Sequence, residues 1–413
     1  MRAVETAWRS APGGITAPRG LRAASAIAGL RATVAAPDLA LLTVADGSAS
    51  AAGVFTTNRF RAAPVLLSEL ALASSGGRAR AIIANAGCAN AGTGPAGMAD
   101  AQRVAARVAD AVGCAPTEVL SASTGLIGSR LDVEAIEEVL PALQPRASRA
   151  AGREAARAIL TTDTRTKEAS VVANLDGRTI TVGGMAKGSG MIHPQMATML
   201  AFVATDATIE PPLLAALLRD AVRDSFNQVT VDGDTSTNDS VFLLATGAAG
   251  GPSLAGSGDE EGAVAAIAAG VSLVCRDLAR QIAADGEGAT RLIEVNVTGA
   301  LTVDEARLAA RSVAGSNLVK AAVHGADPNW GRIAAAAGRS GATLDPGRLV
   351  IWIGDQRVFA GEPCPFDEKL ASRHLRRKRV TLRIDLGIGP GAGEAWGCDL
   401  SADYVAINSE YAT

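Results

Sequence analysis

The segment KGSGMIHPQMATMLAFVATDA, residues 187–207, joins a loop of small residues to an apolar run that we predict to be a buried strand. The loop carries Lys187, a run of glycine and serine, and Pro194, which fixes a bend in the backbone. The hydroxyl of Thr198 stands among apolar residues at the start of the strand. A threonine at such a position is usually a packing residue. The alternative is that the loop and the hydroxyl form one reactive site.

A threonine hydroxyl can attack the carbonyl carbon of the residue before it, and the acyl group then moves from nitrogen to oxygen. Hydrolysis of the resulting ester would leave Thr198 as a new N-terminus, with a free amine beside its hydroxyl. An α-amine has an unperturbed pKa of about 7.7 to 8.0, so it can serve as a general base near neutral pH. Such a site needs no histidine, and the chain has only 3.

Strand-like and helix-like segments alternate on both sides of this segment, which favours an α/β fold. On the N-terminal side we predict strands at LALLTV, AAGVFTT, APVLLSEL, ARAIIANAG and EVLSASTG, and a helix over 98–112. We also predict two helices over 132–159, separated at Pro141 and Pro145, and a hairpin turn at Asp176 and Gly177. On the C-terminal side we predict strand SVFLLATG, a helix from PPLLAALL, a helix over 263–284 capped by a left-handed Gly286, and an edge strand at 381–386 decorated by the charged run RHLRRKRV.

The composition bounds the class of protein. The 413 residues carry 39 Lys+Arg against 42 Asp+Glu, a formal net charge of -3, which gives no nucleic-acid footprint. No apolar run of membrane-spanning length and no secretory signal are present, so we expect a cytoplasmic protein with no membrane segment. The 5 cysteines form no CxxC pair and indicate free thiols. No histidine lies at ligand spacing from another, so we expect no metal site.

Three further motifs each have a structural and a chemical interpretation. SASTGLIG places Thr124 and Gly125 after a strand, either as a plain turn or as a hydroxyl and an N–H that stabilise an oxyanion. DGEGAT places Glu287 between glycines, either as an exposed loop residue or as a carboxylate that binds a substrate ammonium. VDGDTSTND departs from the calcium-loop spacing after its glycine, which favours a turn capped by side chains. Lys187 does not match the spacing of a phosphate-binding loop.

Eleven motifs follow one another along almost the whole chain: TAPRGLRAA, AAGVFTTNRFRAAPV, ASTGLIG, TTDT, GGMAKGSGM, MATMLAF, SFNQVTVDGDTSTND, DGEGAT, DPNWGRIAAAAG, WGCDLSADYV and INSEYAT. Together they resemble the ornithine acetyltransferase and glutamate N-acetyltransferase family of arginine biosynthesis. This resemblance implies a layered αββα sandwich over residues 1–285, which carries the cleavage site, and a smaller C-terminal α/β domain over 286–413.

The resemblance also implies the roles of individual residues. The chain would cleave itself between Ala197 and Thr198, giving an α chain of residues 1–197 and a β chain that begins with the nucleophile Thr198. Thr124 and Gly125 match the pair that stabilises the oxyanion. The positions that match the substrate-binding residues of the family are Thr161, Lys187, Thr198, Glu287, Asn408 and Thr413.

The implied reaction is a ping-pong acetyl transfer from N2-acetylornithine to glutamate through an acetyl-Thr198 ester, giving ornithine and N-acetylglutamate. The resemblance implies no cofactor, leaves open acetyl-CoA as a second donor, and implies that the α and β chains assemble into a hetero-oligomer.

Two departures from the family pattern are His193 with Gln195, and NAGCANAGTG in place of NSGNANACTG. Two alternatives remain: an N-terminal-nucleophile aminopeptidase or amidohydrolase, in which water accepts the acyl group, and an uncleaved amino-acid-binding scaffold.

Overall fold

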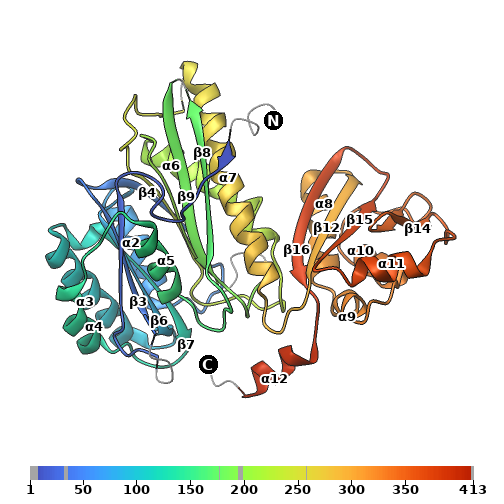
Figure 1. Cartoon of the computed structure of the whole chain (residues 1–413), viewed down its shortest axis with the longest axis horizontal. Coiled ribbons are helices and arrows are strands. Elements are labelled where there is room, and N and C mark those ends of the chain that lie inside the picture. Colours follow the sequence, from blue (N-terminus) through green and yellow to red (C-terminus); the bar gives the residue numbers. More distant parts are fainter. Residues whose placement is uncertain (1–7, 32–35, 176, 194–198, 257, 411–413) are drawn as a thin grey trace.

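Three β-sheets organise the computed structural model, which describes residues 8–31, 36–175, 177–193, 199–256 and 258–410. A seven-stranded and a four-stranded sheet stack face to face in the N-terminal body, and a five-stranded sheet forms the C-terminal body (Figure 1). Helices cover the outer faces of the two stacked sheets. The N-terminal body is therefore the αββα sandwich that the sequence indicates.

The seven-stranded sheet contains the segment with which the sequence analysis began. Its central strands are antiparallel β9 and β10, and β11 then runs parallel to β10. In spatial order the strands are β1 (Arg9–Ser10), β8 (Lys167–Leu175), β9 (Arg178–Lys187), β10 (Leu200–Thr205), β11 (Ser240–Ala245), β4 (Ala49–Phe55) and β5 (Arg78–Ala79). Gly177 has a φ of 78°, as the predicted hairpin turn requires, whereas Asp176 lies outside the described residues.

The four-stranded sheet lies on one face of the larger sheet, and apolar side chains fill the space between them. Phe202 of β10 is 1 % exposed and stacks on Phe242 of β11 with ring centroids 5.8 Å apart. Most other residues of this layer are Ala, Leu or Ile, as expected for a chain with 3 % aromatic residues. The four strands in order are β2 (Leu21–Ala26), β3 (Leu39–Val44), β6 (Ala81–Cys88) and β7 (Val119–Leu126).

The helices of the N-terminal body pack mainly on the outer faces of the two sheets. α3 and α4 contribute to the core outside the smaller sheet, and α6 and α7 to the core outside the larger one. The helices are α2 (Ala63–Ser74), α3 (Gly94–Val112), α4 (Val133–Val139), α5 (Arg149–Ala158), α6 (Pro211–Arg223) and α7 (Glu261–Ala284). Short 3-10 turns lie at η1 (Pro116–Glu118), η2 (Leu140–Ala142), η3 (Phe226–Gln228) and η4 (Gly258–Glu260).

Two local predictions in this body are wrong. APVLLSEL, predicted as a strand, lies in helix α2, where Pro64 occupies the first turn and loses no helical hydrogen bond. A short apolar run does not distinguish a strand from a buried helix, which explains the error. Helix α7 ends with Asp285 at a φ of -115°, and the left-handed glycine is Gly288, at 66°, rather than Gly286.

Helix α7 is long and apolar enough to cross a membrane by length and composition. In the structure it packs along β8 and β9, and Val271, Val274 and Leu278 are fully buried in the core that it shares with that sheet. Its apolar face is thus covered by protein, as in the core helix of a layered α/β fold.

The C-terminal body is a mixed sheet covered by its own helices, with a separate apolar core. Its strands in order are β14 (Gln356–Ala360), β13 (Val350–Ile353), β15 (Arg379–Asp385), β12 (Leu292–Ala300) and β16 (Gly391–Cys398). Its helices are α8 (Val303–Ala314), α9 (Asn317–Gly325), α10 (Trp330–Gly338) and α11 (Glu368–Leu375), and α12 (Ala402–Glu410) follows the last strand.

The charged run RHLRRKRV does not mark an edge strand. Strand β15 pairs with β12 on one side and β13 on the other, so it is internal to the sheet. The prediction is wrong because most of these charges lie at the end of α11 and in the turn before the strand, and Arg379 pairs with Glu294 of the neighbouring strand.

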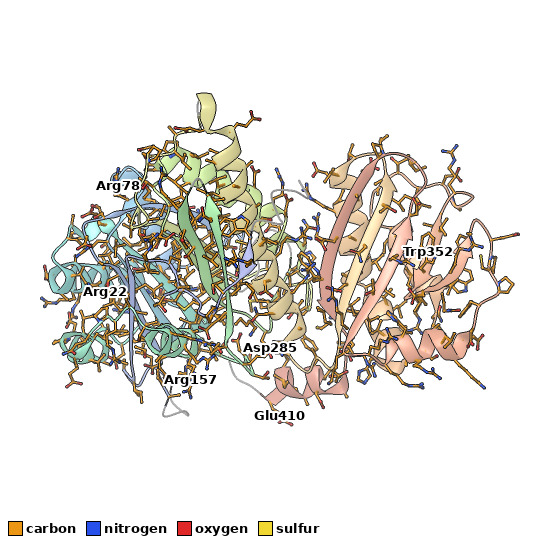
Figure 2. All side chains as sticks on the ribbon, turned by 45° about the horizontal axis from the view of Figure 1, so that its top comes forward. Arg22, Arg78, Arg157, Asp285, Trp352 and Glu410 are labelled. Atoms are coloured by element: carbon orange, nitrogen blue, oxygen red, sulfur yellow. The ribbon has the colours of Figure 1, made fainter. Side chains whose placement is uncertain are left out.

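Strand β16 carries the main apolar contact between the two bodies. Trp396 is fully buried and belongs to the core outside the seven-stranded sheet, and its carbonyl accepts a hydrogen bond from the N–H of Thr230 at 2.9 Å. Arg280 of α7 lies 5.1 Å from the centre of its ring. Figure 2 shows side chains filling both bodies, with Asp285 near their junction and Trp352 in the C-terminal sheet. A domain boundary at residues 285 and 286 stays a prediction.

The packing between the two stacked sheets predicts the effect of one truncation. Phe202→Ala should lower the free energy of unfolding by about 3–5 kcal/mol, because the protein loses buried apolar surface and gains a cavity beside Phe242. Phe60→Ala is the matched control, since Phe60 is 58 % exposed and should cost far less. Denaturant titration of both variants measures the difference. Equal losses in the two variants would contradict this description of the core.

Candidate active site

The pairing of β9 with β10 defines the location of the candidate site. Leu200 is the Cα partner of Lys187, so the chain leaves the sheet after Lys187 and returns to the same end of it at Met199. Ala197 and Thr198 lie outside the described residues, but Thr198 is bonded to Met199. Met199, the residue that follows the predicted nucleophile, therefore lies beside the end of β9.

Met199 is held by a buried carboxylate. Its N–H donates a hydrogen bond to Asp239 Oδ1 at 2.8 Å, and its carbonyl accepts one from the N–H of Ser240 at 3.2 Å. Asp239 is fully buried, and this burial raises its pKa well above the ordinary carboxyl value against the opposing effects of the Met199 N–H and the Lys187 charge. Asp239 Oδ2 has no hydrogen-bond partner among the described residues.

Lys187 joins two of the predicted threonines. Its Nζ donates a hydrogen bond to Thr161 Oγ1 at 2.7 Å and lies 3.4 Å from Thr124 Oγ1. Thr124 is on β7 of the smaller sheet, Thr161 follows α5, and Lys187 ends β9 of the larger sheet. The ammonium thus lies where the two layers of the sandwich meet. Thr124 Oγ1 accepts from Lys187, and a hydroxyl that accepts one hydrogen bond can still donate another to a ligand.

Gly125, the second predicted oxyanion residue, needs to be glycine. Its φ is 129°, in the region that only glycine adopts without strain. A Cβ at this position would lie 2.3 Å from the backbone carbonyl carbon of Gly87 on the neighbouring strand. The register of β6 and β7 is irregular at this point. The strand is therefore distorted directly after Thr124, at the second residue of the predicted oxyanion pair.

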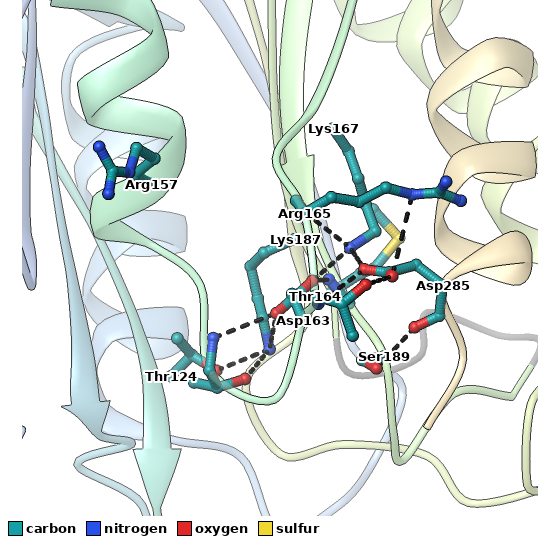
Figure 3. A network of polar contacts seen from close by, with 12 residues as sticks. Thr124, Arg157, Asp163, Thr164, Arg165, Lys167, Lys187, Ser189 and Asp285 are labelled. Carbon is teal, nitrogen blue, oxygen red and sulfur yellow. Dashed lines mark hydrogen bonds and ion pairs between the residues drawn. The ribbon is translucent and has the colours of Figure 1, made fainter. Parts of the chain in front are cut away.

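A buried network of charges lies behind Lys187 (Figure 3). Asp163 accepts hydrogen bonds from Lys167 Nζ at 2.6 Å and from the N–H of Gly188 at 2.7 Å, and its other oxygen lies 3.8 Å from Lys187 Nζ. Lys167 also donates to Asp285 at 2.5 Å. The side chains of Lys167 and Asp163 have no exposed surface.

The charges in this network act on one another. Burial lowers the pKa of Lys187, and Asp163 opposes that shift, whereas the positive charge of Lys167 adds to it. Burial raises the pKa of Asp163, but the two lysines and the Gly188 N–H outweigh that effect and lower it to about 2. Asp163 is thus a carboxylate at neutral pH.

Glu287 and Asn408 come together on the other side of the loop that follows β9. The Asn408 side chain on α12 donates a hydrogen bond to Glu287 Oε2 at 2.9 Å, and the N–H of Glu287 donates to the carbonyl of Ser189 at 3.0 Å. A Cβ at Gly190 would lie 2.3 Å from the Glu287 carboxyl carbon, so the loop backbone passes close to the Glu287 side chain.

Two other sequence features are accounted for by local structure. Asp232 accepts a hydrogen bond from the N–H of Asp234 at 3.2 Å, as the capped-turn interpretation predicts, and it also accepts from the N–H groups of Met191 at 2.6 Å and Ile192 at 2.8 Å. His193 is half-buried, and its Nδ1 lies 3.2 Å from Thr230 Oγ1. Burial lowers the pKa of His193. Among the described residues no cluster of three or more His, Cys, Asp or Glu could hold a metal ion.

The structure thus gathers Thr124, Gly125, Thr161 and Lys187 on one side of the loop, and Glu287 with Asn408 on the other; Thr413 lies outside the described residues. The sequence analysis did not single out Asp163, Lys167, Asp239 or Asp285. TTDT contains Asp163 and TSTND contains Asp239. Lys167 begins strand β8, KEASVVANL, whose next residue is also charged, so no distinct signal marked it in the sequence.

A cavity of about 580 Å³ lies elsewhere, lined mainly by residues of α6, α7 and β16. None of the candidate site residues lines it. Its charged side chains pair with one another, as Arg307 does with Asp224 and Arg276 with Glu394.

The sequence model described as the ArgJ family matches residues 22–413. The arginine biosynthesis bifunctional protein ArgJ of Dehalococcoides mccartyi is 49 % identical over 403 residues, which are 97 % of this chain and 98 % of that protein. The protein of the same name from Symbiobacterium thermophilum is also 49 % identical over 403 residues, 97 % of this chain and 99 % of that protein. A crystal structure of ornithine acetyltransferase from Mycobacterium tuberculosis, complexed with ornithine, is 41 % identical and covers 45 % of this chain and 98 % of that chain, with a TM-score of 0.41.

Identity near one half over almost the full length of both chains leaves no large segment unmatched, including the C-terminal motifs. The chain belongs to the ArgJ family.

Proposed function

We propose that this acetyltransferase of arginine biosynthesis moves the acetyl group of N2-acetylornithine to glutamate through an ester on Thr198. The observation that carries the proposal is the pairing of Lys187 with Leu200, which brings the start of β10 to the Lys187, Thr124 and Thr161 cluster. Membership of the ArgJ family supports the reaction class.

The first half of the reaction begins with the Thr198 hydroxyl oxygen, which attacks the acetyl carbonyl carbon while the α-amine of Thr198 takes the hydroxyl proton. The carbonyl oxygen becomes an oxyanion, which Thr124 and Gly125 stabilise by hydrogen bonds. The carbon–nitrogen bond then breaks, and ornithine leaves with the proton. The second half reverses these steps, with the amine of glutamate attacking the acetyl ester.

The two substrates share an α-carboxylate and differ at the end of the side chain. Lys187 is a suitable partner for a carboxylate, because its ammonium is buried and anchored by two threonine hydroxyls. Glu287 is a suitable partner for the side-chain ammonium of ornithine, and Asn408 fixes its direction. Thr161 and Thr413 complete the proposed binding set.

Cleavage between Ala197 and Thr198 creates the amine that this mechanism needs, so processing precedes activity. We also propose assembly of the α and β chains into a hetero-oligomer, a cytoplasmic location, and catalysis with no cofactor, acetyl-CoA remaining a candidate second donor. The aminopeptidase and scaffold alternatives are not favoured, because the match to the ArgJ family runs to residue 413.

Thr198→Ala should abolish both cleavage and transfer, since it removes the attacking oxygen, and Thr198→Ser should retain a part of each. Denaturing gel electrophoresis measures the cleaved fraction, and ornithine release from N2-acetylornithine measures transfer. Thr117→Ala, which removes an exposed hydroxyl from the η1 turn, is the control for loss of a hydroxyl. Turnover by the Thr198→Ala protein would refute the mechanism.

Thr124→Val should lower kcat about 10²–10³-fold, because it keeps the side-chain shape and removes one donor to the oxyanion. Ser123→Ala on the same strand is the control, since Ser123 donates its hydrogen bond to Asn85 at 2.6 Å instead. Steady-state assays on the cleaved fraction compare them. A similar kcat in the two variants would remove Thr124 from the oxyanion site.

Glu287→Gln should raise KM for N2-acetylornithine about tenfold or more and change KM for glutamate much less, since only the former substrate carries a side-chain ammonium. The amide keeps the size of the side chain and a hydrogen-bond acceptor for Asn408. Initial rates with each substrate varied in turn give both constants. Equal increases in the KM values for N2-acetylornithine and for glutamate would assign Glu287 a role common to the two substrates.

A further inference from the structure

We propose that Asp163 is a positioning residue for acetyl transfer, which holds Lys187 in place and charged. Lys167 and Asp285 connect Asp163 to the segment that carries Glu287. This inference rests on the function proposed above, because it assumes that the Lys187 ammonium binds a substrate carboxylate. Asp163 acts through Lys187 and need not touch the substrate.

The contacts of Asp163 restrain the whole neighbourhood of Lys187. One carboxylate oxygen accepts from the N–H of Gly188, the residue directly after Lys187, at 2.7 Å. The other accepts from the N–H of Thr161 at 3.1 Å, and the hydroxyl of Thr161 binds Lys187 Nζ at 2.7 Å. Asp163 therefore fixes the backbone that follows the lysine and the threonine that receives its hydrogen bond.

The two lysines share Asp163 unequally. Lys167 donates to it at 2.6 Å, whereas the nearest contact of Lys187 is 3.8 Å. Asp163 thus supplies a nearby negative charge to Lys187 without taking a close hydrogen bond from it. The N–H groups of Lys187 can then point to Thr161, Thr124 and a substrate, while the ammonium stays compensated in a buried place.

A second carboxylate extends the network toward Glu287. Lys167 donates to Asp285 at 2.5 Å, and Asp285 also accepts from the N–H of Thr164 at 3.1 Å. The Asp285 carbonyl accepts from Ser189 Oγ at 2.7 Å, and the Ser189 carbonyl accepts from the N–H of Glu287. Figure 3 shows this succession from Thr124 through Lys187 and Asp163 to Asp285.

A purely structural role would not explain these charges well. Buried ion pairs cost desolvation, and apolar side chains of similar size often give equal or greater stability. Here the bonds of Asp163 end on Lys187's immediate neighbours, and those of Asp285 end beside Glu287. The network therefore joins the two sides of the proposed substrate site across the glycine-rich loop.

Asp163 and Lys167 have opposite effects on the pKa of Lys187, so changing each residue should shift the pH profile in the opposite direction. Activity that needs a charged Lys187 falls as the pH rises through its pKa. Burial lowers that pKa most; Asp163 opposes the lowering, as Glu287 and Asp239 do, whereas Lys167 adds to it. Asp163→Asn should therefore move the alkaline limb of kcat/KM for N2-acetylornithine to lower pH, and Lys167→Met should move it to higher pH, each by about 1 pH unit.

Asp206→Asn is the matched control. Asp206 is fully buried at the far end of β10, where it accepts from the N–H of Thr181 at 2.8 Å, so its loss costs stability without touching this network. All three variants and the unaltered enzyme are assayed as cleaved protein, with thermal unfolding midpoints and with acetylation of the β chain by N2-acetylornithine measured beside the pH profiles.

Shifts of opposite sign in Asp163→Asn and Lys167→Met, with an unshifted limb in Asp206→Asn, support the inference. If only one network variant folds, the sign of its shift decides. The inference would be overturned if the alkaline limb does not shift in either network variant, or if it shifts in the same direction in both. It would also be overturned, in favour of a structural role, if both network variants fail to fold while Asp206→Asn folds. Absence of acetylation in the unaltered enzyme would instead refute the proposed function.

Discussion

The antiparallel pairing of β9 with β10 is the constraint on which the site depends. It fixes Lys187 opposite Leu200, so the segment that contains the proposed cleavage site begins and ends at the same end of these two strands. The parallel partner β11 then places Asp239 against the Met199 N–H. Because both strands are buried in the middle of a seven-stranded sheet, a register slip would turn apolar side chains such as Phe202 away from their layer. The core therefore holds β9 and β10 in register.

The same arrangement explains how charged side chains are tolerated inside the sandwich. Lys187 and Lys167 are almost fully buried, and Asp163 and Asp285 compensate them within hydrogen-bond or ion-pair distance. In a site of low dielectric constant, an ammonium held in this way interacts strongly with a ligand carboxylate. The N–H of Gly188 donates to Asp163, and the loop backbone at Gly190 passes close to the Glu287 side chain. The contacts that compensate the buried charges are thus the same contacts that position Lys187 for its proposed role.

The sequence was sufficient for the layered α/β fold and for most strands, because apolar periodicity and family motifs report them directly. The structure brings several of the site residues named from the motifs together, and their roles stay predictions. It failed at APVLLSEL, where a short apolar run fits either a strand or helix α2. It also failed at the charged run before β15, since strand order depends on long-range pairing that charge patterning does not contain. Asp163 and Lys167 were missed for a similar reason, because their roles arise from contacts with β9 and with Asp285 rather than from local spacing.

The most direct test of the central claim is intact-protein mass spectrometry of the purified chain before and after brief incubation with N2-acetylornithine. The account predicts two fragments that divide between Ala197 and Thr198, and one added acetyl group on the fragment that begins with Thr198. Acetyl on the other fragment, or a cleaved protein that gains no acetyl while releasing ornithine, would contradict a covalent Thr198 intermediate.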